Sequence, residues 1–128
     1  MENLNKLVDR LSEVFLPAAV QNQSFFLNDV PVDLAITSNT QYISSVLSRM
    51  ISTVVKHVSD TCIRFTARRH GNIVVLEVQE SGSLHGFAMA SELQQVNSLA
   101  ERFGGRLSIT LPKPETTAIS FIFPDSDN

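Results

Sequence analysis

The sequence contains few of the features that mark secreted or membrane proteins. It has one cysteine, Cys62, among 128 residues, so an internal disulfide is excluded. This cysteine lies in an alternating apolar stretch, which favours a buried, unreactive thiol over a reactive one. No apolar run approaches the roughly 18 residues that a membrane span needs, and the first residues lack the basic and apolar regions of a signal peptide. We therefore expect a cytoplasmic protein without a membrane partner.

The chain also lacks an excess of positive charge. It contains 10 Lys and Arg against 13 Asp and Glu, which gives a formal net charge of -3 and a pI near 5.5. A general nucleic-acid binder needs a basic face for phosphates, so this balance argues against nucleic acid as a partner. The hydrophobic fraction of 43% and the charged fraction of 18% are typical of a globular protein. We predict a single domain over residues 1–128.

Apolar periodicity predicts three helices. The first lies within residues 1–20 and ends near Pro17, and the second follows a capping box that starts at Ser38. The third is expected over residues 88–103, with Gly104 at its end. The second helix has the strongest pattern, because one buried stripe continues over four turns. This stripe consists of Ile43, Val46, Leu47, Met50, Ile51, Val54, Val55 and Val58.

Six extended segments separate these helices. Two short ones lie within residues 23–37, and four with alternating apolar residues cover 62–69, 73–80, 106–111 and 116–123. They are expected to form three hairpin-like pairs. The fold class is predicted to be α+β: a two-layer α/β sandwich whose mixed, mostly antiparallel sheet is covered on one face by helices. The polar tail, residues 125–128, is expected to be frayed.

The second helix contains the stretch RMISTVVKH, residues 49–57. With the order of the elements, it resembles the ATP-binding domain of sensor histidine kinases, a fold shared with gyrase and MutL. That family carries the N-box Asn-Leu-Leu-x-Asn-Ala-x-Lys-His on this helix. The resemblance places Arg49 and Thr53 at the two asparagine positions, and Lys56 and His57 at the Lys-His positions. The second asparagine of the family supplies an oxygen to Mg²⁺, which prefers hard oxygen ligands, so both replacements are expected to weaken Mg²⁺ binding.

The segment ESGSLHG, residues 80–86, resembles the Asp-x-Gly-x-Gly motif of the same family. The resemblance places Glu80 at the position of the aspartate that accepts a hydrogen bond from the adenine amino group. Gly82 stands at the first glycine, where the backbone approaches the base, and Leu84 replaces the second. Glutamate keeps the carboxylate but adds a methylene group.

The family's phosphate-binding glycines before the third helix are missing from this chain. Their positions fall on Ala90 and Glu92, so a carboxylate would point at the phosphates, and the lid is reduced to a few residues around HGFAMAS. The glycine before the closing strand is replaced by Glu115. These losses, beside an intact core pattern, lead to the prediction that the chain is not an enzyme and has no cofactor.

The resemblance then implies a two-component signalling module of the pseudokinase type, which docks a response regulator or a kinase. An alternative is a nucleotide sensor that binds ATP or ADP without Mg²⁺ through Lys56, Glu80 and Gly82. A second alternative is a histidine phosphotransfer protein. It would form a homodimer through the N-terminal helix, but the shortness of that helix argues against it.

The residues alone leave less specific interpretations open. The side chains of Thr53, Lys56 and His57 could form a solvated helix face, and Glu80 could be a surface carboxylate at a strand end. His70 and His85 have no Cys, Asp or Glu at the spacing of metal ligands, so a metal site is not expected.

Overall fold

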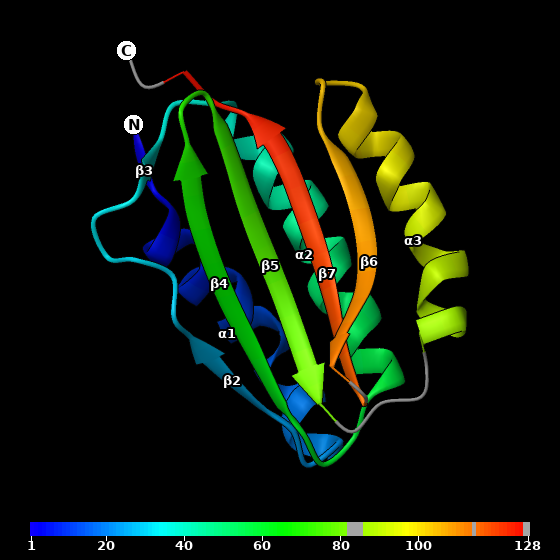
Figure 1. Ribbon diagram of the computed structural model, residues 1–128. Helices are drawn as coiled ribbons and strands as arrows, with labels where there is room; N and C mark the ends of the chain where they lie inside the picture. Colours follow the sequence, from blue (N-terminus) through cyan, green and yellow to red (C-terminus); the bar gives the residue numbers. More distant parts are fainter. Residues whose placement is uncertain (82–85, 114, 127–128) are drawn as a thin grey trace.

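The computed structural model of the protein describes residues 1–81, 86–113 and 115–126 (Figure 1). These residues form three helices and seven strands. Their bounds are β1 Glu2–Asn3, α1 Leu4–Gln21, β2 Phe25–Asn28, β3 Ala35–Ile36, α2 Thr40–His57, β4 Cys62–His70, β5 Ile73–Ser81, α3 Gly86–Glu101, β6 Arg106–Lys113 and β7 Thr116–Pro124. Among the described residues, no helix has the combination of length and apolar character that crossing a membrane requires.

Five strands form one sheet in the order β2-β4-β5-β7-β6, and β1 pairs separately with β3. Among the described strand pairs of the large sheet, β2–β4 is parallel and the others are antiparallel. All three helices lie against one face of this sheet (Figure 1), which confirms the predicted fold class. We call the other face the open face, because no described helix covers it.

Two of the three predicted hairpin pairs are present, β4–β5 and β6–β7. The pairing expected within residues 23–37 is wrong, because β2 runs parallel to β4 while β3 joins β1. The parallel register places Phe26 against Phe65, with 5.8 Å between the ring centroids. Phe26 is partly buried and packs against the core that contains Phe65, so this aromatic contact accompanies the parallel pairing.

Helix α1 is longer than predicted, since it passes through Pro17 and ends at Gln21. Asn3 caps its start by accepting a hydrogen bond from the Lys6 amide at 3.0 Å. Proline removes one intrahelical hydrogen bond. The carbonyl without a helical partner is that of Glu13, four residues before Pro17. Both residues are exposed, so water can donate a hydrogen bond to this carbonyl.

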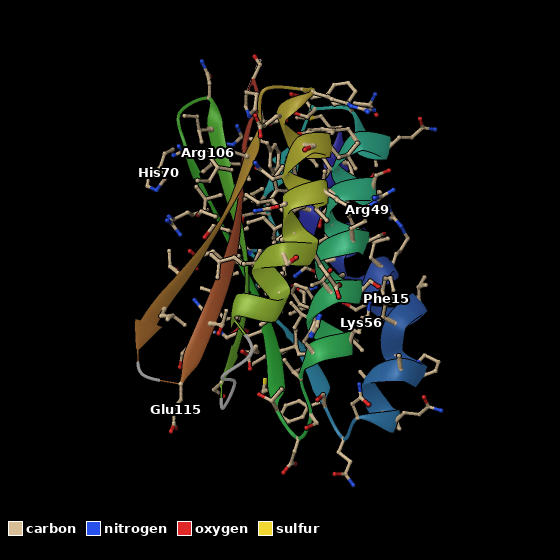
Figure 2. All side chains as sticks on the ribbon, turned by 90° about the vertical axis from the view of Figure 1, so that its right-hand side faces the viewer. Phe15, Arg49, Lys56, His70, Arg106 and Glu115 are labelled. Atoms are coloured by element: carbon tan, nitrogen blue, oxygen red, sulfur yellow. The ribbon has the colours of Figure 1, made fainter. Side chains whose placement is uncertain are left out.

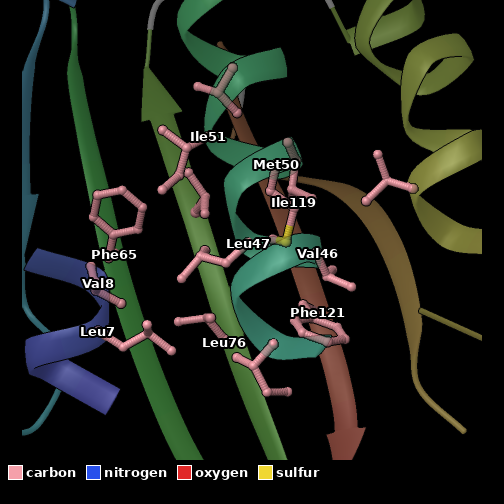
Figure 3. Packing of buried hydrophobic residues seen from close by; sticks show 14 of the residues in the cluster. Leu7, Val8, Val46, Leu47, Met50, Ile51, Phe65, Leu76, Ile119 and Phe121 are labelled. Atoms are coloured by element: carbon pink, nitrogen blue, oxygen red, sulfur yellow. The ribbon is translucent and has the colours of Figure 1, made fainter. Parts of the chain in front are cut away.

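Helix α2 packs across the middle of the sheet and supplies the centre of the core. Figure 3 shows its residues Val46, Leu47, Met50 and Ile51 above side chains of the strands. The predicted capping box at Ser38 is wrong, because Asn39 is the cap and accepts from the amides of Gln41 and Tyr42 at 2.9 and 3.3 Å. The Ser38 hydroxyl instead donates to Asp125 at 2.6 Å.

The end of the chain is held by a buried carboxylate. The residue Asp125 is 2% exposed and accepts hydrogen bonds from the amides of Thr37 and Ser38 at 2.8 and 2.6 Å. Arg69 Nη2 donates to the same carboxylate at 2.6 Å. We call these four residues the C-terminal latch. The prediction of a frayed tail over 125–128 is therefore wrong for Asp125, and residues 127–128 lie outside the described part.

Helix α3 begins and ends two residues earlier than predicted, and Gly104 follows its last turn with a positive φ of 86°. The amide of Gly105 bonds to the carbonyl of Ala100 at 3.0 Å, which also accepts from the Tyr42 hydroxyl at 2.8 Å. This hydrogen bond links the end of α3 to the first turn of α2.

Candidate functional site

A groove of about 420 Å³ lies between α2 and α3, and we call it the α2–α3 groove. Residues one helical turn apart share a face, so Arg49, Thr53 and Lys56 of α2 all reach it. Figure 2 shows Arg49 and Lys56 on α2. Three of the predicted site residues are therefore brought together. The described residues that line the groove are Arg49, Ser52, Thr53, Lys56, Ser91, Glu92, Gln95 and Val96.

Glu92 of α3 lines the groove and also contacts His57 of α2. Its Oε1 atom lies 2.9 Å from His57 Nε2 and 3.1 Å from Lys56 Nζ. The hydrogen bond from His57, followed by that from Lys56, lowers the pKa of the Glu92 carboxyl below its ordinary value. The carboxylate therefore carries its charge at neutral pH and accepts from both neighbours.

The two cations of the groove differ in their pairing. Lys56 is held by Glu92, although its side chain is 65% exposed. Arg49 is exposed and forms no ion pair with any residue that the structure describes. A guanidinium group offers five donors in a planar arrangement that matches phosphate and carboxylate oxygens. Arg49 is thus the cation of the groove that is available to an anion.

Thr53 is only 6% exposed, so the interpretation of a solvated helix face is wrong for this residue. It lines the groove from α2 at the position where the family resemblance places a metal-binding amide. Beside the positive charge of Arg49, the described lining offers mainly hydroxyl oxygens, and its one carboxylate, Glu92, is paired with Lys56 and His57. This is a poor set of ligands for Mg²⁺, which requires near-octahedral hard oxygens. The described residues also contain no group of three His, Cys, Asp or Glu that could hold a metal ion.

A second polar pair lies at the end of β5, on the side of the sheet that faces the helices. Glu80 is 3% exposed, so the interpretation of a surface carboxylate is wrong. It stands opposite Thr117 of β7 in the strand register. Thr117 is 1% exposed, and its Oγ1 has no hydrogen-bond partner among the described residues. A buried hydroxyl gains from a hydrogen-bond partner, so Thr117 is a candidate contact for a ligand.

The end of β5 is tied to the segment that follows α2. The Thr61 hydroxyl donates to the Ser81 carbonyl at 2.6 Å and accepts from the Ser81 amide at 3.3 Å. Glu80 therefore lies at the same end of the domain as the C-terminal half of α2 (Figure 1). It is not part of the groove lining. Gly82, the remaining predicted site residue, and Leu84 lie outside the described residues.

Sequence reasoning missed two groups of site residues. The sequence around Thr117 indicates only an alternating strand. The strand register, which places Thr117 opposite Glu80, makes it a site residue. Ser91 and Gln95 reach the groove because α3 packs against α2, which local spacing does not reveal. The resemblance places the Glu92 carboxylate at a phosphate site, but it does not reveal the partners of Glu92, Lys56 and His57.

No protein-family model matches the chain, and no curated protein matches its sequence. Solved structures do match it. The histidine kinase AdeS of Acinetobacter baumannii superposes with a TM-score of 0.81 at 11% identity, over 99% of this chain and 66% of that chain. The catalytic domain of histidine kinase ThkA superposes with a TM-score of 0.73 at 17% identity, over 97% of this chain and 93% of that domain.

ThkA has also been solved in complex with the response regulator protein TrrA, and that structure matches with a TM-score of 0.75 at 18% identity. The superposition covers 97% of this chain and 41% of the matched chain of the complex. These matches contradict the prediction that the chain is not an enzyme, because the ThkA domain it resembles is a catalytic domain. At such low identity the likeness concerns the fold. The chain has the fold of the catalytic domains of histidine kinases.

Proposed function

We propose that the chain is a nucleotide-binding domain of two-component signalling, which holds the phosphates in the α2–α3 groove and an adenine base near Glu80. The observation that carries this proposal is the position of the two polar sites. A cationic groove and a buried carboxylate lie at the same end of α2, in a domain with the fold of histidine-kinase catalytic domains.

The groove supplies suitable groups for a phosphate. Arg49 provides a planar set of donors, and the hydroxyl groups of Ser52, Thr53 and Ser91 lie in the same lining. Its volume of about 420 Å³ is within the usual range of small-molecule sites. The phosphate end of the ligand would therefore contact α2 first, through Arg49.

The polar pair at the end of β5 favours adenine over guanine. The amino group of adenine is a donor, whereas guanine presents an acceptor oxygen at the corresponding atom. A carboxylate such as Glu80 accepts from the first and repels the second. The Thr117 hydroxyl, which has no partner among the described residues, can donate to a ring nitrogen of the same base.

Mg²⁺ is not required in this proposal. The ligand set around Thr53 does not fit the ion, and the nearby Glu92 carboxylate is already bound to Lys56 and His57. Binding then depends on protein cations. We expect ATP or ADP to bind in the presence of a chelator.

The test is a calorimetric and thermal-shift titration of the whole chain with ATP, ADP and GTP, each with Mg²⁺ and with EDTA. A ligand present at 100 times its Kd adds about 2.7 kcal/mol to the stability of the folded state, which raises the Tm by several degrees in a domain of this size. We expect a shift with ATP or ADP in EDTA, and a smaller one with GTP.

Matched variants locate the ligand. Arg49→Gln removes the available cation and should weaken binding at least about tenfold, because a charged hydrogen bond contributes about 1.5–3 kcal/mol. Glu80→Gln should weaken ATP and ADP binding. Arg102→Gln removes an exposed cation outside the groove lining and should change nothing. The absence of any shift at millimolar nucleotide would overturn the proposal.

A response regulator is the proposed protein partner, by analogy with the ThkA complex. The open face supports this proposal through a row of four residues in register: Arg68, Val75, Ile122 and Arg106. Two arginines beside an apolar centre suit an acidic surface. Charge reversal of both arginines should weaken binding to purified response regulators, whereas Lys6→Glu on α1 should not. Equal binding by the two variants would reject this face.

The remaining predictions about partners stay predictions. A homodimer through the N-terminal helix stays a prediction: Leu4, Leu7 and Val8 are buried in the chain's own core, whereas Val14, Leu16 and Val20 of the same helix are exposed. Phosphotransfer through His57 gains no support, because the His57 side chain is 20% exposed and is held by Glu92.

A further inference from the structure

We propose that Glu92 determines the class of anion that the α2–α3 groove accepts: a single phosphate group binds readily, and longer phosphate chains are disfavoured. This inference rests on the proposed nucleotide-binding function and names its ligand class. Glu92 acts here as a selectivity residue, because its carboxylate occupies Lys56 and His57, the groups that a second and third phosphate would need.

The geometry gives the first step. One oxygen of Glu92 lies 2.9 Å from His57 Nε2 and 3.1 Å from Lys56 Nζ, so the same atom bridges two neighbouring groups of α2. These are hydrogen-bond distances. A phosphate oxygen that approached Lys56 would have to take the position of this carboxylate oxygen.

The charges give the second step. Among the described residues, the charged members of the lining are Arg49, Lys56 and Glu92, which together carry one net positive charge. One phosphate group carries about 1.5–2 negative charges, and each further phosphate adds more. Arg49 can neutralise about half to two thirds of the charge of the first. A second or third phosphate would meet the negative charge of Glu92.

The exposure of Glu92 gives the third step. Its side chain is 35% exposed, so it can turn towards solvent and leave Lys56 and His57 to a longer phosphate chain. That rotation breaks two charged hydrogen bonds. Only a longer ligand requires the rotation, so the loss of these bonds lowers the affinity for longer ligands and not for single phosphates. A ligand with one phosphate binds at Arg49 without this loss.

The test compares the whole chain with its Glu92→Gln and Glu101→Gln variants. Glu101 is the matched control, because it is an exposed carboxylate of the same helix that bonds to Asn97 outside the groove lining. Calorimetry in EDTA measures the affinities for AMP, ADP and ATP. The same series is run with inorganic phosphate, pyrophosphate and tripolyphosphate as probes.

In the unmodified chain and in Glu101→Gln, we expect affinity to fall as the phosphate chain lengthens. In Glu92→Gln, the affinity for ATP and tripolyphosphate should rise about tenfold relative to AMP and phosphate, which equals about 1.4 kcal/mol. Adding Lys56→Gln to Glu92→Gln should remove this gain, because the released lysine is the group that contacts the longer chain. Unfolding curves of each variant verify that the domain remains folded.

The outcomes separate this inference from the proposed function. If nucleotides bind and Glu92→Gln leaves the relative affinities for AMP, ADP and ATP unchanged, the inference is overturned and the proposed function stands. If tripolyphosphate gains affinity in Glu92→Gln while no nucleotide binds either protein, the inference stands and the proposed function is overturned. If no anion binds to either protein, both are overturned.

Discussion

Removal of the Asp125 carboxylate should destabilise the domain more than removal of any exposed ion-pair partner. Its side chain has no solvent exposure, and it accepts from two backbone amides as well as from Arg69. Asp125→Ala leaves the guanidinium group and both amides without this acceptor. Breaking a buried ion pair by removing one partner costs about 3–5 kcal/mol, which is a large share of the about 5–15 kcal/mol that stabilises a typical domain.

Urea unfolding followed by circular dichroism measures this cost. Asp29→Asn is the matched control, since Asp29 also bonds to an arginine, Arg64, at 2.6 Å, but its side chain is 39% exposed. Exposed pairs contribute about 0–1 kcal/mol. If Asp125→Ala costs no more than Asp29→Asn, the latch does not stabilise the domain and the argument from burial is refuted.

The latch also predicts a direction for the pH dependence. Burial acts to raise the pKa of Asp125, but hydrogen bonds from Ser38, Arg69 and Thr37 outweigh it and hold the pKa below its ordinary value. The folded state therefore releases this proton more readily than the unfolded state, in which the aspartate pKa is about 3.9. The stabilisation is complete above that value and is lost as the pH falls through the lower folded pKa. In Asp125→Asn this part of the acid sensitivity should disappear.

Three further substitutions test the packing around α2 by thermal or urea unfolding. Gly105→Ala should cost about 1–3 kcal/mol, because its Cβ would clash with the Tyr42 hydroxyl and lie 2.9 Å from the Ile122 carbonyl; an unchanged Tm would contradict this. Asn39→Ala should cost about 1 kcal/mol through loss of the cap, and a neutral result would show that the cap contributes little. Met50→Ala should cost about 2–5 kcal/mol, since Met50 has no exposure, and a smaller loss would mean that the core collapses around it.

The regular parts of the fold could be predicted because local patterns specify them. The apolar stripe of α2 selects one buried face, and its residues Val46, Met50 and Val54 are indeed buried. The hairpins β4–β5 and β6–β7 are formed by strands that are adjacent in the sequence. The parallel partner of β2 could not be read in this way, because it depends on Phe26 meeting Phe65 across a long connection.

The site could be predicted only where one helix carries it. Arg49, Thr53 and Lys56 are one turn apart on α2, so their common face follows from helical geometry. The contact between Glu92 and His57 depends instead on how α3 packs against α2. The burial of Glu80 depends on the strand register, which places it opposite Thr117. The choice of Asn39 over Ser38 as cap likewise depends on Asp125, which lies far along the chain.

The central claim is that a nucleotide binds at this end of the domain without Mg²⁺. The most direct measurement is a two-dimensional ¹⁵N NMR titration of the labelled chain with ADP in EDTA, since it reports both binding and location. We predict saturable shifts that are concentrated at residues 49–57 of α2, at 91–96 of α3 and around Glu80 and Thr117. Unchanged spectra at millimolar ADP, or shifts confined to the open face around Arg68 and Arg106, would contradict the account.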